Sequence, residues 1–79
     1  MPTELHAALA TTLRRLRQER EMTQEDLAFE SGVGRVSIAK METGRRLPSL
    51  PTLFELSRAL GVTPGDFVKA LAAEAEELS

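Results

Sequence analysis

Cysteine, tryptophan and tyrosine are absent from this sequence of 79 residues. Without cysteine, the chain has neither a disulfide framework nor a thiolate metal site. Its only large aromatic side chains are three phenylalanines, so a core has to be built mainly from leucine, alanine, valine and isoleucine. A domain this short depends on helix packing, and often on association with a second chain, for its stability.

Long apolar runs are missing as well. No stretch of about 20 apolar residues could cross a membrane, and the start of the chain lacks the apolar segment of a secretory signal. The length leaves no room for a separate catalytic or ligand-binding unit. We therefore expect a single domain over residues 1–79, located in the cytoplasm and without a membrane partner.

No set of residues in the sequence could run a reaction. His6 is the only histidine, and we expect it to be exposed near the start of the first helix. The sequence contains neither a carboxylate pair nor a metal-ligand cluster at a motif spacing. The glycines at 32 and 34 form a turn and not a phosphate-binding loop, because no strand precedes them. We expect no enzyme activity, no catalytic residue, no metal, no cofactor and no small-molecule ligand.

The formal net charge of −2 argues against nucleic acid as a partner, but the distribution of charge argues for it. Residues 1–30 carry four cations and six anions, and residues 51–79 carry two cations and five anions. Residues 31–50 carry a single anion, Glu42, and the four cations Arg35, Lys40, Arg45 and Arg46. Local charge decides phosphate binding, so residues 31–50 are the candidate contact surface. Ordinary charge scatter in a solvated loop is the alternative.

Residues 31–44 of this basic segment belong to a pattern of two short helices joined by a tight turn, TQEDLAFESGVGRVSIAKMETG, residues 23–44. Thr23 and Asp26 form an N-cap signature, because the hydroxyl can accept the Asp26 amide and the carboxylate lies near the positive end of the helix dipole. Gly32 can take the left-handed conformation that ends the helix. A second helix is predicted from about Arg35 to Glu42, with Gly34 as its cap.

At about 100° per residue, this second helix has two faces. Ile38 and Met41, with the Cβ of Glu42, share one side. The opposite side carries Arg35, Val36, Ala39, Lys40 and Thr43. A short helix that is anchored by apolar residues and presents cations and small side chains outward fits the major groove of DNA.

The remaining sequence predicts three more helices, which makes the fold class all-α, a compact five-helix domain. The first runs from about Thr3 to Arg20, with a core stripe of Leu5, Leu9, Thr12, Leu13 and Leu16. The fourth runs from about Leu50 to Leu60, capped by Ser49, with the stripe Leu53, Leu56 and Leu60. The last runs over about 64–77, capped by Thr63, with the stripe Phe67, Val68, Leu71, Ala75 and Leu78.

Four short helices are too few to cover all of the apolar stripe on the last helix. We therefore expect residues 64–77 to contribute to a two-fold dimer interface, formed by Phe54, Phe67, Leu71 and Leu78. The alternative is that the stripe closes the core of the single chain.

These residues resemble the helix-turn-helix of the Xre family, the Cro/cI-type repressors of phages and their bacterial relatives. The matching residues are Arg17, Thr23, Gln24, Leu27, Ala28, Ser31, Gly32, Val33, Ile38, Glu42 and Gly44, followed by Pro48, Ser49 and Leu50. The segment 60–64, LGVTP, fits the family's junction between the fourth and fifth helices. The resemblance covers about residues 8–70, in spacing as well as identity. Within the family, LAFESGV and ETGRR are most similar to the small controller proteins of restriction–modification systems.

The resemblance implies a lambda-repressor-like fold and a sequence-specific transcriptional regulator that binds double-stranded DNA as a homodimer. It also implies that Arg17 pairs with Glu42 near a phosphate, and that Gln24 contacts a phosphate. Glu42, Ile38 and Met41 would then support the recognition helix. Two positions depart from the family's usual residues, namely Gly34 at the cap and Val36 on the outward face.

The predicted DNA contacts fall into two groups. The base contacts are Arg35, Val36, Ser37 and Lys40, with Arg35 suited to guanine and Val36 to a thymine methyl group. The backbone contacts are Arg17, Gln24, Thr43, Arg45 and Arg46. A protein-interaction module is the alternative, because antitoxins and adaptor proteins use the same fold. The sequence leaves open the operator and the sign of regulation.

Overall fold

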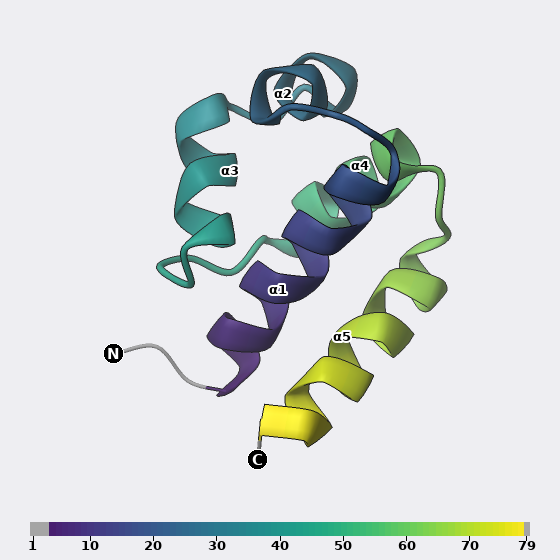
Figure 1. Cartoon of the computed structure of the whole chain (residues 1–79). Helices are drawn as coiled ribbons and strands as arrows, with labels where there is room; N and C mark the ends of the chain where they lie inside the picture. The colour runs from purple at the N-terminus through teal and green to yellow at the C-terminus, as the bar shows by residue number, and fades with distance from the viewer. Residues whose placement is uncertain (1–3, 79) are drawn as a thin grey trace.

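A computed structural model describes residues 4–78, which fold into five helices without a strand. The helices are α1 (Glu4–Glu19), α2 (Gln24–Ser31), α3 (Arg35–Glu42), α4 (Leu50–Leu60) and α5 (Pro64–Leu78). Figure 1 shows α1 between α3 and α5, with α2 across one end of the molecule. The predicted all-α, five-helix class is therefore confirmed. The predicted start of the first helix, at about Thr3, lies outside the described residues.

The core lies between the five helices, and α1 packs most extensively against α5 and α3. Its buried apolar side chains are Leu9, Leu13, Leu27, Ile38, Met41, Leu56, Ala59, Leu60 and Phe67. The prediction was wrong for Leu5, which is 44% exposed. Leu5 lies in the first turn of α1, before the buried part of that helix begins at Ala8.

No helix within residues 4–78 is long and apolar enough to cross a membrane.

Phe67 also differs from the prediction, which placed it in a dimer interface. Its side chain is 0% exposed and belongs to the core of the single chain. Only three residues separate α4 from α5, so the first turn of α5 is held beside the end of α4 and its aromatic ring turns inward. A buried ring is not available to a second copy. Further along α5, Leu71 is half-buried, while Val68 and Leu78 are exposed.

Three arginines donate hydrogen bonds to carbonyl groups in the last turns of other helices. The pairs are Arg14 with Glu42, Arg20 with Leu60, and Arg58 with Glu30, each with an N to O distance of 3.1 Å. The last carbonyls of a helix have no partner within the helix, and a guanidinium satisfies them while complementing the negative end of the dipole. These bonds fix the ends of α3, α4 and α2 against their neighbours.

Candidate nucleic-acid interface

The first helix of the two-helix pattern, α2, begins and ends as the sequence predicts. Thr23 Oγ1 accepts a hydrogen bond from the Asp26 amide at 3.0 Å, and the Thr23 amide donates to the Asp26 carboxylate at 2.9 Å. The hydrogen bond that the Thr23 backbone amide donates to the carboxylate is the main cause that lowers the pKa of Asp26, and the Thr23 side chain adds to it. At the other end, Gly32 has a φ of +75° and its amide donates to the Ala28 carbonyl. The chain therefore turns sharply after α2.

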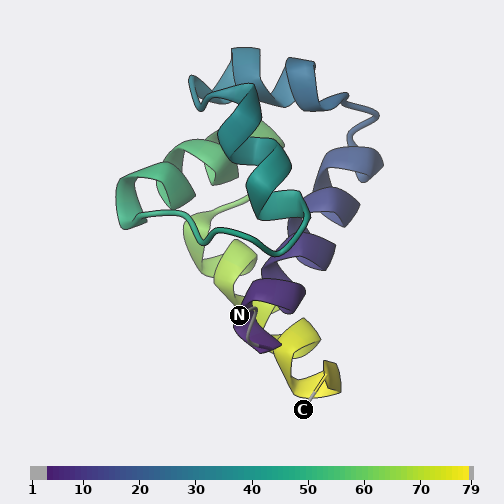
Figure 2. The same ribbon diagram turned by 90° about the vertical axis from the view of Figure 1, so that its left-hand side faces the viewer.

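The turn between α2 and α3 is short and locally held. The Val33 amide donates to Ser31 Oγ at 3.1 Å, and Val33 packs against the core. Gly34 then caps α3 with extended backbone and no side-chain hydrogen bond. Figure 2 shows α3 crossing one face of the molecule, with the loop of residues 43–49 leading from it to α4.

The two predicted faces of α3 are present in the structure. Ile38, Met41 and Glu42 are buried, so they lie against the rest of the domain. Arg35, Val36, Lys40 and Thr43 are exposed, and Ala39 is half-buried. A helix held from behind by Ile38 and Met41 thus presents its cations to solvent.

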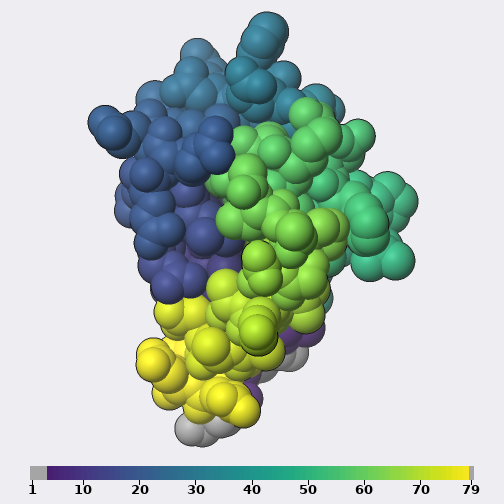
Figure 3. Space-filling model, turned by 90° about the vertical axis from the view of Figure 1, so that its right-hand side faces the viewer, coloured from purple at the N-terminus to yellow at the C-terminus, as the bar shows by residue number. Residues whose placement is uncertain are grey.

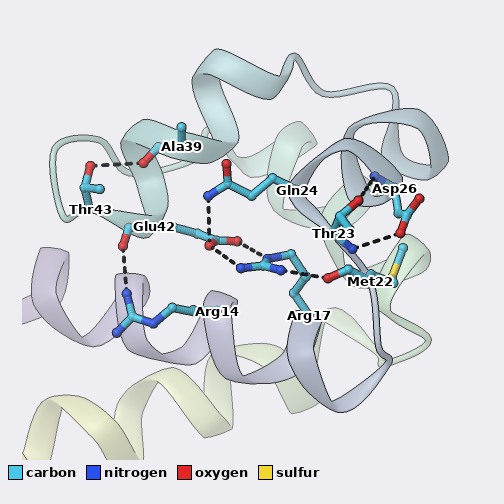
Figure 4. Close-up of polar contacts among 9 residues, drawn as sticks. All are labelled: Arg14, Arg17, Met22, Thr23, Gln24, Asp26, Ala39, Glu42 and Thr43. Carbon is cyan, nitrogen blue, oxygen red and sulfur yellow. Dashed lines mark hydrogen bonds and ion pairs between the residues drawn. The ribbon is translucent and has the colours of Figure 1, made fainter.

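Glu42 connects three helices through its side chain (Figure 4). Arg17 on α1 donates to it twice, with Nε to Oε2 at 2.6 Å and Nη2 to Oε1 at 2.9 Å. Gln24 on α2 donates to the same Oε1 at 3.2 Å. Glu42 is 3% exposed, and its hydrogen bond and charge raise the pKa of Arg17 although burial acts the other way. The implied Arg17–Glu42 pair is therefore confirmed, and it fixes the end of α3 on α1.

Arg17 and Gln24 have few N–H donors left for a ligand, because most of them already bind within the domain. Arg17 directs its third nitrogen, Nη1, to the Met22 carbonyl at 2.7 Å. Gln24 already uses one amide N–H on Glu42, so a phosphate has access only to the other. Phosphate contacts by Arg17 and Gln24 therefore remain predictions, while their bracing of Glu42 is a structural fact.

The loop after α3 is folded closely against the helix. Gly44 is buried, has a φ of +76°, and lies so near α1 that an added Cβ would be 3.7 Å from the His6 carbonyl oxygen. His6, which we expected to be exposed, is half-buried. Thr43 Oγ1 donates to the Ala39 and Lys40 carbonyls, so a phosphate contact from this hydroxyl requires it to rotate.

We call the four exposed cations Arg35, Lys40, Arg45 and Arg46 the basic face. The side chains of Arg35, Lys40 and Arg45 make no hydrogen bond or ion pair with any residue from 4 to 78. Arg46 Nη1 donates to Ser37 Oγ at 3.1 Å. Because Glu42 is buried against Arg17, its charge does not offset the basic face. Nowhere in the described chain do three or more acidic or histidine side chains gather in a way that could hold a metal ion.

Sequence reasoning missed two of these contacts, the hydrogen bond from Arg14 to the Glu42 carbonyl and the hydrogen bond from Arg46 to Ser37. Arg14 and Arg17 lie three residues apart on one flank of α1, a spacing that could have indicated a shared partner, and both bind Glu42. The bond between Ser37 and Arg46 had no such signal, because the two residues are joined by an irregular loop.

An outward basic helix, preceded by a capped helix and a tight turn, defines a helix-turn-helix protein. The model of the HTH_3 family, described as helix-turn-helix, matches residues 13–67. The chain therefore belongs to this Xre-type family and is a helix-turn-helix DNA-binding transcriptional regulator. The family is one of regulators and not of enzymes.

Similar proteins include regulators and restriction–modification controllers. The HTH-type transcriptional regulator y4dJ of Sinorhizobium fredii is 35% identical over 65 residues, which cover 82% of this chain and 84% of that protein. Control protein C.BamHI of Bacillus amyloliquefaciens is 45% identical over 47 residues, which cover 60% of this chain and 58% of that protein.

Solved structures of controller proteins share most of this fold. The tetramer of C.Esp1396I in complex with its natural 35 base-pair operator matches with a TM-score of 0.81 and 30% identity, over 90% of this chain and 93% of that one. C.AhdI from Aeromonas hydrophila matches with a TM-score of 0.75 and 34% identity, over 78% of this chain and 94% of that one. The structure of this chain is thus closely similar to those of restriction–modification controllers.

Proposed function

We propose that the chain binds a two-fold symmetric operator as a homodimer, with α3 of each copy in a major groove. The centres of the two half-sites would then be about one helical turn, 34 Å, apart. The observation that carries this proposal is the basic face on α3 and its loop, whose neighbouring anion Glu42 is turned inward onto Arg17. The similarity to C.Esp1396I, solved on its natural operator and on a 19 base-pair duplex, supports it.

Base reading is assigned to the outward residues of α3. Arg35 is the first residue of the helix, and its free guanidinium suits bidentate donation to guanine O6 and N7. Val36 is exposed on the same face and suits a thymine methyl group. Lys40, one turn after Val36, reaches a base edge or a phosphate.

Contacts with the DNA backbone are assigned to residues at the edges of the outward face of α3. Arg45 and Arg46 follow α3 in the loop and would contact phosphates, which fix register without reading sequence. Thr43 at the end of α3, and Gln24 and Arg17 behind it, are further candidates for phosphate contacts. A regulator that binds an operator acts where the DNA is, which we propose is the cytoplasm.

The dimer interface is assigned to the α4 and α5 side of the molecule (Figure 3). Phe54 is 55% exposed at a hollow with a largely apolar lining, which it shares with Pro51, Val62 and Pro64. Leu78 is exposed and Leu71 is half-buried on α5. A second copy that covers Phe54 would remove this apolar surface from water and pair two α3 helices for a symmetric site.

Selection of bound duplexes from a random pool tests the proposal. We expect two inverted half-sites about 10 base pairs apart and an affinity that falls steeply with salt. A mobility-shift series with random duplex would show weaker, salt-sensitive binding. If no duplex were retarded at any salt concentration, the protein-interaction alternative would be favoured instead.

A further inference from the structure

Ser37 lies at the boundary between the two faces of α3. At about 100° per residue, it is roughly 60° around the helix from Lys40 on the outward face and 40° from Met41 on the buried face. Its side chain is accordingly half-buried. A short hydroxyl in this position borders the basic face but does not project from its centre.

The loop that carries Arg46 is anchored at both ends. At its start, the Gly44 amide donates to the Met41 carbonyl at 3.2 Å and the Arg45 amide donates to the Lys40 carbonyl at 2.9 Å. At its end, Ser49 Oγ accepts the Thr52 amide at the first turn of α4. The backbone on either side of Arg46 is therefore fixed to α3 and α4.

Between these anchors, the Arg46 guanidinium reaches back to α3 and donates to Ser37 Oγ at 3.1 Å. A small pocket next to this bond is lined by both side chains together with Val33, Met41 and Pro48. The bond uses one of the five N–H donors of Arg46 and leaves the others for a ligand. It also restricts a long side chain that would otherwise lose rotamer freedom when it binds.

We propose that Ser37 is a positioning residue that holds Arg46 against the flank of α3, ready for a backbone phosphate at the edge of the groove. Ser37 then acts through Arg46 and does not read a base, in contrast to the role predicted from the sequence. The inference rests on the proposed function, since it assumes that the basic face binds duplex DNA. Arg45, which carries the same charge without such a bond, is the matched control.

Affinities of five variants for the selected operator and for random duplex, measured over a salt series, test this role. The variants are Ser37→Ala, Arg46→Ala, Arg45→Ala and the two double variants of Ser37→Ala with each arginine change. We expect Ser37→Ala to weaken binding to both duplexes by the same factor, about three-fold, as for one modest hydrogen bond. Arg46→Ala should weaken binding more and make the salt slope shallower by about one phosphate.

Coupling between the two residues is the decisive result. Ser37→Ala should have no further effect when Arg46 is alanine, and its full effect when Arg45 is alanine. Ser37→Thr keeps the hydroxyl and should restore wild-type affinity. Circular dichroism and urea unfolding establish that each variant is folded.

Two results would overturn the positioning role. One is a changed base preference at a single operator position in Ser37→Ala, which would make Ser37 a direct reader. The other is an equal effect of Ser37→Ala with and without Arg46. Both require that the wild-type chain binds DNA, so they differ from failure of the proposed function, in which the wild-type chain binds no duplex and this role falls with it.

Discussion

At the scale of single residues, the four cations of the basic face differ in their hydrogen-bond partners. Arg35 is exposed and has no partner from residue 4 to residue 78, so its guanidinium is free to meet a base edge. Arg46 lies in the loop after α3, and its guanidinium donates a hydrogen bond to Ser37 on that helix. Arg35 should therefore contribute to the choice of DNA sequence, whereas Arg46 should contribute to the affinity for any duplex.

Replacing Arg35 with alanine should cost about 1–3 kcal/mol at one base position and relax specificity there, because a bidentate contact to guanine would be lost. Dissociation constants for the selected operator and its single-base variants measure this effect. Arg15→Ala removes the same charge from an exposed position on α1 and should leave base preference unchanged. A uniform loss across all sequences in Arg35→Ala would identify Arg35 as a phosphate contact.

At the scale of the elements, the orientation of α3 depends on a carboxylate on α3 and a guanidinium on α1. Burial of Glu42 and Arg17 removes both charges from water, a cost that their bidentate geometry and the added bond from Gln24 offset. The angle at which α3 leaves the domain is therefore set by polar groups at its end as well as by Ile38 and Met41.

Glu42→Gln keeps the shape of this side chain but leaves Arg17 without an anion. We expect the free energy of unfolding to fall by about 2–3 kcal/mol, less than for a fully buried pair because Arg17 still reaches solvent at one edge. Urea denaturation measures the change. Glu55→Gln breaks the exposed pair with Arg58 and should cost less than about 1 kcal/mol. Equal losses would mean that the buried pair contributes little to stability.

The start of α2 should respond to acid. Hydrogen bonds from Thr23 lower the pKa of Asp26 in the folded chain, so the unfolded chain takes up this proton at higher pH than the folded one. The stabilisation is complete above the ordinary aspartate pKa and is lost as pH falls through the lowered value. In Asp26→Asn, stability should therefore fall less between neutral and acidic pH than in the wild type. Urea unfolding at several pH values measures the difference.

A neighbouring substitution serves as the control for this pH dependence. Glu25 lies in the same first turn, and its carboxylate makes no hydrogen bond within the described residues. Glu25→Gln should therefore leave the acid limb of the stability profile close to that of the wild type. If both substitutions flattened the limb equally, the cap geometry would not be its cause.

At the scale of the whole molecule, the chain separates two kinds of surface. The basic face lies on α3 and its loop, whereas Phe54 and Leu78, two exposed apolar side chains that we assign to the dimer interface, lie on α4 and α5. A dimer that forms through α4 and α5 would present two basic faces. Binding through two linked α3 helices raises the overall affinity for a symmetric site.

Phe54→Asp should therefore convert the proposed dimer to a monomer and weaken operator binding at least about ten-fold, because a charge in an apolar contact is not compensated. Sedimentation equilibrium and mobility shift measure the two effects. Phe29→Asp is the control, since Phe29 is 86% exposed on α2 and is not among the residues that line the Phe54 hollow. An unchanged dimer in Phe54→Asp would move the interface elsewhere.

The sequence by itself determined the five helices, the capped ends of α2 and α4, and the two faces of α3. Thr23, Gly32 and Ser49 act within three or four residues of their own positions, so their effect is readable without knowing what packs nearby. The outward cations of α3 followed from helical periodicity in the same way.

Only the tertiary structure decided which apolar residues are covered and which polar groups meet. Phe67 is buried and Leu5 is exposed although both fit an apolar stripe, because burial depends on the neighbouring helix and not on the stripe. Ser37 meets Arg46 only because the loop between them folds back onto α3. Contacts across irregular backbone have no period in the sequence, and they are set by the packing of the whole chain.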